Sequence, residues 1–164
     1  MLSVYIIFGF CSVVMLRDLP YGSYLYLIAF LVPWVCDAGS YFIGTKFGRH
    51  KLIPNVSPKK TVEGAVGGIV FGTASAAIYG FIINSLYAVG TNYIVLIVGG
   101  FIICVLGELG DLIASHLKRQ YNKKDYGTIF PGHGGVLDRF DSIIATAPFL
   151  YLMCFIIPVF EIFF

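Results

Sequence analysis

The sequence predicts an all-α, polytopic transmembrane helical bundle of about five membrane helices with two basic cytoplasmic loops. Of the 164 residues, 58% are hydrophobic and only 12% are charged, whereas a soluble domain carries about 25% charged residues. The apolar residues are gathered into long runs, and a helix needs about 20 of them to cross a hydrocarbon core. Ten of the eleven Lys and Arg residues are gathered into two polar segments between these runs. Together these observations predict an integral membrane protein.

Five apolar runs give the expected membrane helices. They cover residues 1–16, 22–44, 65–84, 92–114 and 142–164. The first run is short, but a cleaved signal peptide is the weaker interpretation, because no basic stretch precedes it and no small-residue cleavage site follows it. The four cysteines lie in four different runs without metal-knuckle spacing, so we expect them to pack as small apolar side chains.

The basic residues predict which side each loop faces. Five of the eleven lie in residues 46–60, five lie in residues 118–139, and Arg17 is the remaining one. Two crossings separate the two basic loops, so both emerge on one face, while the loop between them (NSLYAVGTN) carries no charge. Basic loops mark the cytoplasmic side. We therefore expect the N-terminus and both basic loops inside the cell and the C-terminus outside.

Acidic residues within the apolar runs are candidate functional residues. A carboxylate at the bilayer centre is unfavourable by about 2.5 to 3.5 kcal/mol, so it normally faces a protein interior or a watery cavity. Asp37, Glu108 and Asp111 are in this position, whereas Glu161 lies close enough to the chain end to reach the interface. Glu108 and Asp111 are three residues apart and share a helical face with Ser115. Two carboxylates so close together repel each other unless a cation or a proton intervenes.

A second acidic pair precedes the fifth run. Asp138 and Asp141 repeat the three-residue spacing, and would point the same way if a helix begins there. Their hard oxygen donors suit Mg²⁺, which takes one or two protein carboxylates and fills its other positions with water and phosphate. The sequence leaves open whether one or two metal ions bind.

The polar segments supply charge of the opposite sign. Lys118, Arg119 and Lys124 can balance phosphate charge, and the PGHGG turn offers backbone N–H groups at close approach. The SPKKT segment presents hydroxyl and ammonium groups together. Carboxylates, basic side chains and glycine turns on one membrane face predict a metal–polyphosphate site. No P-loop motif occurs, and no strand–helix alternation predicts a dinucleotide fold.

The pattern of these residues resembles the signature of the phosphatidate cytidylyltransferases, also called CDP-diacylglycerol synthases. The matching positions lie in residues 111–141. They are Ser115, Lys118, Arg119, Lys124, Asp125, Gly127, Pro131, His133, Gly134, Gly135, Asp138, Arg139 and Asp141. The upstream segments DAGSYFIGTKFGRHKL and SPKKTVEGAVGG are also similar, so the likeness covers residues 34–141.

The resemblance implies a Mg²⁺-dependent membrane nucleotidyltransferase of phospholipid biosynthesis that condenses CTP with phosphatidic acid to CDP-diacylglycerol and pyrophosphate. It assigns catalysis to Asp111, Asp138, Asp141, Lys118 and Arg119. It assigns metal binding to Asp111 and Asp138 as the leading ligands, with Asp141 and Asp37 close by. It assigns substrate binding to Ser57, Lys59, Lys60, Ser115, Lys124, His133, Gly134, Gly135 and Arg139. The partners implied are CTP, phosphatidic acid and membrane lipid, with a homodimer as an open alternative and no nucleic acid.

Residues 1–164 are expected to form a single integral membrane catalytic domain with its active site on the cytoplasmic face. Family members are typically longer, with additional helices before the region of Asp37, so a naturally short form, a truncated form and a fragment remain alternatives. Two other functions also remain: an inactive remnant or membrane scaffold of this family, and a cation or proton transporter. A transporter would bury acids in its helices too, but would not need two basic, hydroxyl-bearing loops on one face.

Overall fold

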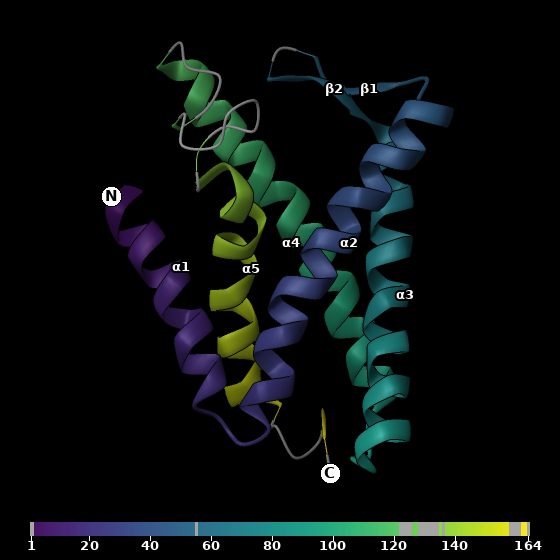
Figure 1. Ribbon diagram of the computed structural model, residues 1–164. Helices are drawn as coiled ribbons and strands as arrows, with labels where there is room; N and C mark the ends of the chain where they lie inside the picture. Colours follow the sequence, from purple (N-terminus) through teal and green to yellow (C-terminus); the bar gives the residue numbers. More distant parts are fainter. Residues whose placement is uncertain are drawn as a thin grey trace.

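The computed structural model describes residues 2–54, 56–121, 126–127, 135, 137–157 and 162–163. These residues form five helices and one short hairpin (Figure 1). In chain order the elements are α1 (Leu2–Arg17), α2 (Gly22–Phe47), β1 (Lys51–Ile53), β2 (Ser57–Thr61), α3 (Val62–Tyr87), α4 (Tyr93–Gln120) and α5 (Leu137–Ile156). The predicted helical bundle is confirmed.

Four of these helices, α2 to α5, are long and apolar enough to cross a membrane, so the chain is a multi-pass membrane protein. The 16 residues of α1 span about 24 Å at 1.5 Å per residue, which is less than the hydrocarbon core. A fifth crossing by α1 therefore stays a prediction. Large apolar side chains remain exposed along the outside of the bundle, among them Val70, Phe81 and Ile94, as expected where the surroundings are lipid tails.

The helix bounds differ from the apolar runs where polar residues continue a helix beyond its apolar part. Helix α4 extends to Gln120 and so includes Ser115, Lys118 and Arg119. Helix α5 begins at Leu137, five residues before the predicted run, and ends at Ile156. A membrane helix can extend into the interface when its backbone bonds remain satisfied within the helix, and hydropathy does not report that extension.

The hairpin was not predicted from the sequence. Strands β1 and β2 pair antiparallel, with Lys51 opposite Thr61 and Ile53 opposite Ser57. At the end of β2 the hydroxyl of Thr61 accepts a hydrogen bond of 3.1 Å from Gly64 N and caps α3. The hairpin is short and mostly polar on its surface, so it lacks the alternating hydrophobic pattern that would predict a strand.

Glycines allow the helices to approach closely. Helix α3 carries small residues every fourth position, and these face inward: Gly64, Gly68, Gly72, Ala76 and Gly80. A Cβ at Gly68 would overlap the hydroxyl of Ser40 on α2, so only glycine permits this contact. Small residues at such interfaces bring helix backbones together in membranes. Helix α3 packs against α2 and α4, while α5 packs against α1 and α4.

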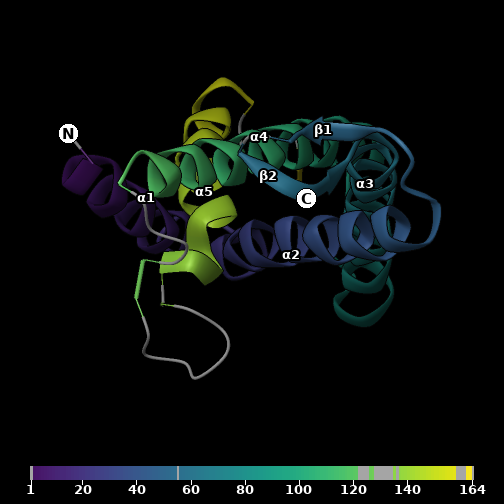
Figure 2. The same ribbon diagram turned by 90° about the horizontal axis from the view of Figure 1, so that it is seen from above.

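The polar segments lie at one end of the bundle. Figure 1 shows the N-terminus, the hairpin, the end of α4 and the start of α5 at that end, with the C-terminus and the α3–α4 connection at the other. Seen from above, β2 lies between α2 and α4 in the projection (Figure 2), and it contacts α2, α3 and α4. The relative placement of the two basic segments therefore agrees with the predicted topology.

Candidate active site

Five carboxylates gather at the polar end of the bundle, and we call them the carboxylate cluster. They come from α2, α4 and α5 and comprise Asp37, Glu108, Asp111, Asp138 and Asp141. Two lysines, Lys60 from β2 and Lys118 from α4, enter the cluster. The cluster thus combines five carboxyl groups with two ammonium groups.

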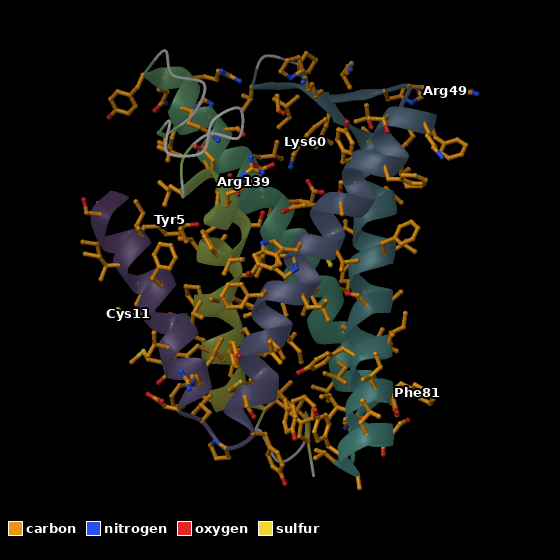
Figure 3. The ribbon with its side chains drawn as sticks, in the orientation of Figure 1. Tyr5, Cys11, Arg49, Lys60, Phe81 and Arg139 are labelled. Atoms are coloured by element: carbon orange, nitrogen blue, oxygen red, sulfur yellow. The ribbon has the colours of Figure 1, made fainter. Side chains whose placement is uncertain are left out.

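Lys60 joins the two acids of α4. Its ammonium lies 2.6 Å from Glu108 Oε2 and 2.7 Å from Asp111 Oδ2. The other Glu108 oxygen accepts a short hydrogen bond from the hydroxyl of Ser40. Figure 3 shows Lys60 below the hairpin, on the side of α2 and α4. Burial disfavours the charged form of Lys60, but Asp111 and Glu108 outweigh it, so the pKa of the Lys60 ammonium lies above its usual range.

Asp111 on α4 and Asp141 on α5 meet at the centre of the cluster. Their carboxyl groups are direct neighbours. The approach depends on Gly110, where a Cβ would overlap the Cβ of Ala145. Ser115 Oγ lies 3.5 Å from Asp111 Oδ1, and Lys118 Nζ lies 4.0 Å from Asp141 Oδ2. Two adjoining carboxylates of this kind can both be ionised only if a cation compensates their charge.

Asp138 ties the first turn of α5 to α4 and to the segment between them. One oxygen accepts from Lys118 Nζ at 2.8 Å, and the other accepts from the backbone N–H groups of Tyr126 at 2.8 Å and Gly135 at 2.9 Å. Lys118 Nζ also lies 5.2 Å from the centre of the Tyr126 ring. Burial raises the pKa of the Tyr126 hydroxyl, although Lys118 opposes that effect.

Asp37 occupies the inner edge of the cluster on α2. Its Oδ2 accepts a hydrogen bond of 2.9 Å from the hydroxyl of Ser142 on α5. The backbone N–H of Ser142 lies 3.0 Å from Asp141 Oδ1. Asp37 is therefore connected to Asp141 through one serine.

A cavity of about 590 Å³ opens beside the cluster. Its lining includes the acids Asp37, Glu108 and Asp111 and the lysines Lys59 and Lys60. Pockets that take small ligands commonly measure about 300 to 1,000 Å³. The cavity is therefore large enough for a nucleotide and carries charges of both signs on its wall.

The carboxylate cluster fits Mg²⁺ by donor chemistry rather than as a preformed cage. Within the described ranges, no three His, Cys, Asp or Glu side chains are already arranged around one metal position. Asp111 and Asp141 nevertheless offer adjoining hard oxygens. Mg²⁺ needs only one or two protein carboxylates when water and substrate phosphate supply its other ligands.

The structure describes four more of the predicted site residues. Arg119 Nε donates to Val56 O at 3.3 Å and so connects the end of α4 to the hairpin. Ser57 begins β2, and Arg139 is exposed on the first turn of α5 (Figure 3). Gly135 contacts Asp138 through its backbone, as described above. Three predicted residues lie outside the described part of the chain: Lys124, His133 and Gly134.

Two serines belong to the site but were not predicted from the sequence. Ser40 donates to the buried acid Glu108 and Ser142 to the partly buried acid Asp37, each on another helix. Ser40 lies one helical turn after Asp37, and Ser142 directly follows Asp141. Their spacing could have suggested the same region, but a serine in a membrane helix more often bonds its own backbone.

Comparison with known proteins identifies relatives of this chain. The sequence profile described as "Cytidylyltransferase family" matches residues 1–157. A Bacillus subtilis protein named phosphatidate cytidylyltransferase is 43% identical over 152 residues, which is 92% of this chain and 55% of that protein. Proteins of the same name from Staphylococcus haemolyticus and Staphylococcus aureus strain COL are 40% and 42% identical over 132 and 134 residues, each covering 80% of this chain and 49% of the relative.

The chain thus spans about half the length of the curated relatives it matches. The family match covers most of the chain, including every described member of the carboxylate cluster and both of its lysines. The resemblance seen in residues 34–141 is therefore confirmed, and the chain belongs to the cytidylyltransferase family.

Proposed function

We propose that this chain transfers a cytidylyl group from CTP to phosphatidic acid and forms CDP-diacylglycerol and pyrophosphate. The names of its relatives support the choice of substrates. The structural observation that carries the proposal is the pair Asp111 and Asp141, which adjoin between Lys60 and Lys118 at the polar end of a membrane bundle. Such a site suits two anionic substrates, one of which is a lipid.

The reaction requires no covalent intermediate on the protein. A phosphate oxygen of phosphatidic acid attacks the α-phosphorus of CTP, the bond from that phosphorus to the bridging oxygen breaks, and pyrophosphate leaves with the bond electrons. Lysines bind phosphate oxygens through charge-assisted hydrogen bonds. Lys59 and Lys60 line the cavity and would hold the nucleotide phosphates. Lys118 and Arg119 would bind substrate phosphates from the α4 side.

Mg²⁺ is proposed as the cofactor, with Asp111 and Asp141 as the central ligands and with Asp138 and Asp37 at the edge of the same cluster. When bound, it would neutralise charge on phosphoryl oxygens and on the leaving group. Lys60 contacts Asp111, and Lys118 lies near Asp141 and contacts Asp138. These lysines therefore balance the acids that would hold the ion.

The proposed orientation places the site on the cytoplasmic face, where CTP is available. The basic segments support this orientation because basic loops mark the cytoplasmic side. The lipid would reach the site laterally, with its phosphate at the level of the interface. A homodimer of this chain is proposed as its assembly.

The test is CTP-dependent incorporation of labelled cytidylyl groups into lipid by membranes that contain this chain, with added phosphatidic acid and Mg²⁺. We expect labelled CDP-diacylglycerol and one pyrophosphate for each lipid. The matched control is Asp111→Asn, which keeps the size of the side chain but removes its charge. A scaffold, an inactive remnant or a cation transporter gives no labelled lipid, and that result would refute the proposed activity for this chain.

A further inference from the structure

Glu108 is a buried acid with no direct role in the proposed reaction. It lies on α4, one turn before Asp111, and only 6% of the residue is exposed. Both carboxylate oxygens are engaged, one by Ser40 and the other by Lys60. An acid buried in a membrane helix is unfavourable unless it is paired, and such acids usually mark a function.

Lys60 needs an anchor that does not depend on Asp111. It extends from a short hairpin on a long flexible side chain, and fixing such a side chain is entropically unfavourable. Its two carboxylate partners are Glu108 and Asp111. Asp111 is also the proposed metal ligand, so its oxygens cannot serve Lys60 alone once the site is occupied. Glu108 remains available because it adjoins the cavity while its other oxygen is tied to α2.

We propose that Glu108 is a positioning residue: fixed by Ser40, it holds the Lys60 ammonium at the cavity wall, where that ammonium binds a phosphate of the incoming nucleotide. The inference rests on the proposed function, since it needs CTP to occupy this cavity. Glu108 acts through Lys60 and touches no reacting atom.

A purely structural role explains the contacts less well. Buried ion pairs seldom stabilise a fold more than apolar residues of similar size would. The packing of α4 here is supplied by neighbours such as Gly107 and Gly110, which approach α5. A helix-packing role would therefore be served by an apolar side chain, whereas holding a lysine at a cavity wall requires an acid.

The experiment is a double-mutant cycle with Glu108→Gln, Lys60→Ala and the double variant. For each variant, KM for CTP, kcat and the equilibrium binding of CTP without phosphatidic acid are measured in neutral detergent. Glu108→Gln keeps the hydrogen bond with Ser40 but loses the charge that holds Lys60. We expect each single variant to weaken CTP binding and raise KM by about tenfold, with kcat changed by less than about threefold. The double variant should match Lys60→Ala alone, because Glu108 has no effect without its lysine.

Glu63→Gln is the matched control. Glu63 is also a hydrogen-bonded acid near the hairpin, but it pairs with His50 and with the backbone at the end of α2. We expect its KM to equal that of the wild type. Ser40→Ala provides a second route if Glu108→Gln fails to accumulate: it should raise KM by about threefold, and this increase should vanish in the Lys60→Ala background.

Several results would overturn the inference. Wild-type CTP binding in Glu108→Gln, or effects of Glu108→Gln and Lys60→Ala that multiply in the double variant, would show that Glu108 does not act through Lys60. Lipid labelling in the wild type together with either result would leave the proposed function standing. Failure of the wild type to bind CTP at all would overturn both the inference and the proposed function.

Discussion

The contact between Gly110 and Ala145 predicts a variant that separates the two central carboxylates without altering either of them. A Cβ built at Gly110 would overlap Ala145 Cβ and lie 3.5 Å from the carbonyl oxygen of Asp141. Carbon atoms pack at about 3.5 to 4.0 Å, and Ala145 has no side-chain torsion that could relieve the overlap. Because the added Cβ would lie only 2.3 Å from Ala145 Cβ, helix α5 must move away from α4 by about 1.2 to 1.7 Å in Gly110→Ala, carrying Asp141 away from Asp111.

The expected magnitude follows from that displacement. Overpacking of this kind destabilises by about 1 to 3 kcal/mol, which leaves the protein folded. A misplacement of about 1 Å in a site that works by positioning lowers turnover by about 100-fold. Both quantities are measured on one detergent preparation, by thermal unfolding and by labelled lipid formed at saturating CTP and Mg²⁺.

Gly99→Ala is the matched control, because Gly99 lies on the same helix and also faces α5. Its added Cβ would meet Met153 Cε at 3.1 Å, and the flexible end of a methionine can move aside. We expect Gly99→Ala to keep nearly wild-type turnover. If Gly110→Ala stays within about threefold of the wild type while folded, close apposition of Asp111 and Asp141 is not needed and our reasoning about the site is wrong.

Three further predictions address the remaining parts of the site. Asp111→Asn and Asp138→Asn should each abolish turnover while the protein stays in the membrane, and near-normal turnover at saturating Mg²⁺ would remove that residue from the metal site. Lys118→Ala should lower kcat, because Lys118 follows Asp111 on α4, whereas Lys59→Ala should raise KM for one anionic substrate. If both variants change kcat and KM by less than about threefold, these lysines only anchor the protein to anionic lipid. In a variant lacking the native cysteines, Ala88→Cys should be labelled from outside sealed cells and Lys59→Cys should not, and the reverse pattern would invert the proposed orientation.

The sequence predicted the helical bundle and the emergence of the two basic segments on one face because both depend on quantities summed along the chain. Hydropathy over about 20 residues reports membrane helices wherever they pack, and alternate crossings place residues 46–60 and 118–139 on one face. Helix ends were less predictable. Lys118 and Arg119 extend α4 although they are polar, and the hairpin Lys51–Thr61 has too little alternation to be recognised.

The site was predicted as a set of residues, and the tertiary structure decided their pairing. Lys60 meets Glu108 across 48 positions of sequence, and Ser142 meets Asp37 across 105. Such pairs depend on how each helix is rotated about its axis and how closely it approaches its neighbour. Gly68 and Gly110 set that approach by permitting contacts that a Cβ would block.

The sequence by itself therefore determined that this is a membrane protein with acids and lysines gathered in its polar segments, and its motif indicated the family. Only the tertiary structure decided that Asp111 adjoins Asp141, that Asp138 bonds Lys118 and two backbone N–H groups, and that Glu108 holds Lys60. The physical reason is that charge and hydropathy act residue by residue, whereas the geometry of a site is fixed by packing between helices that are distant in sequence.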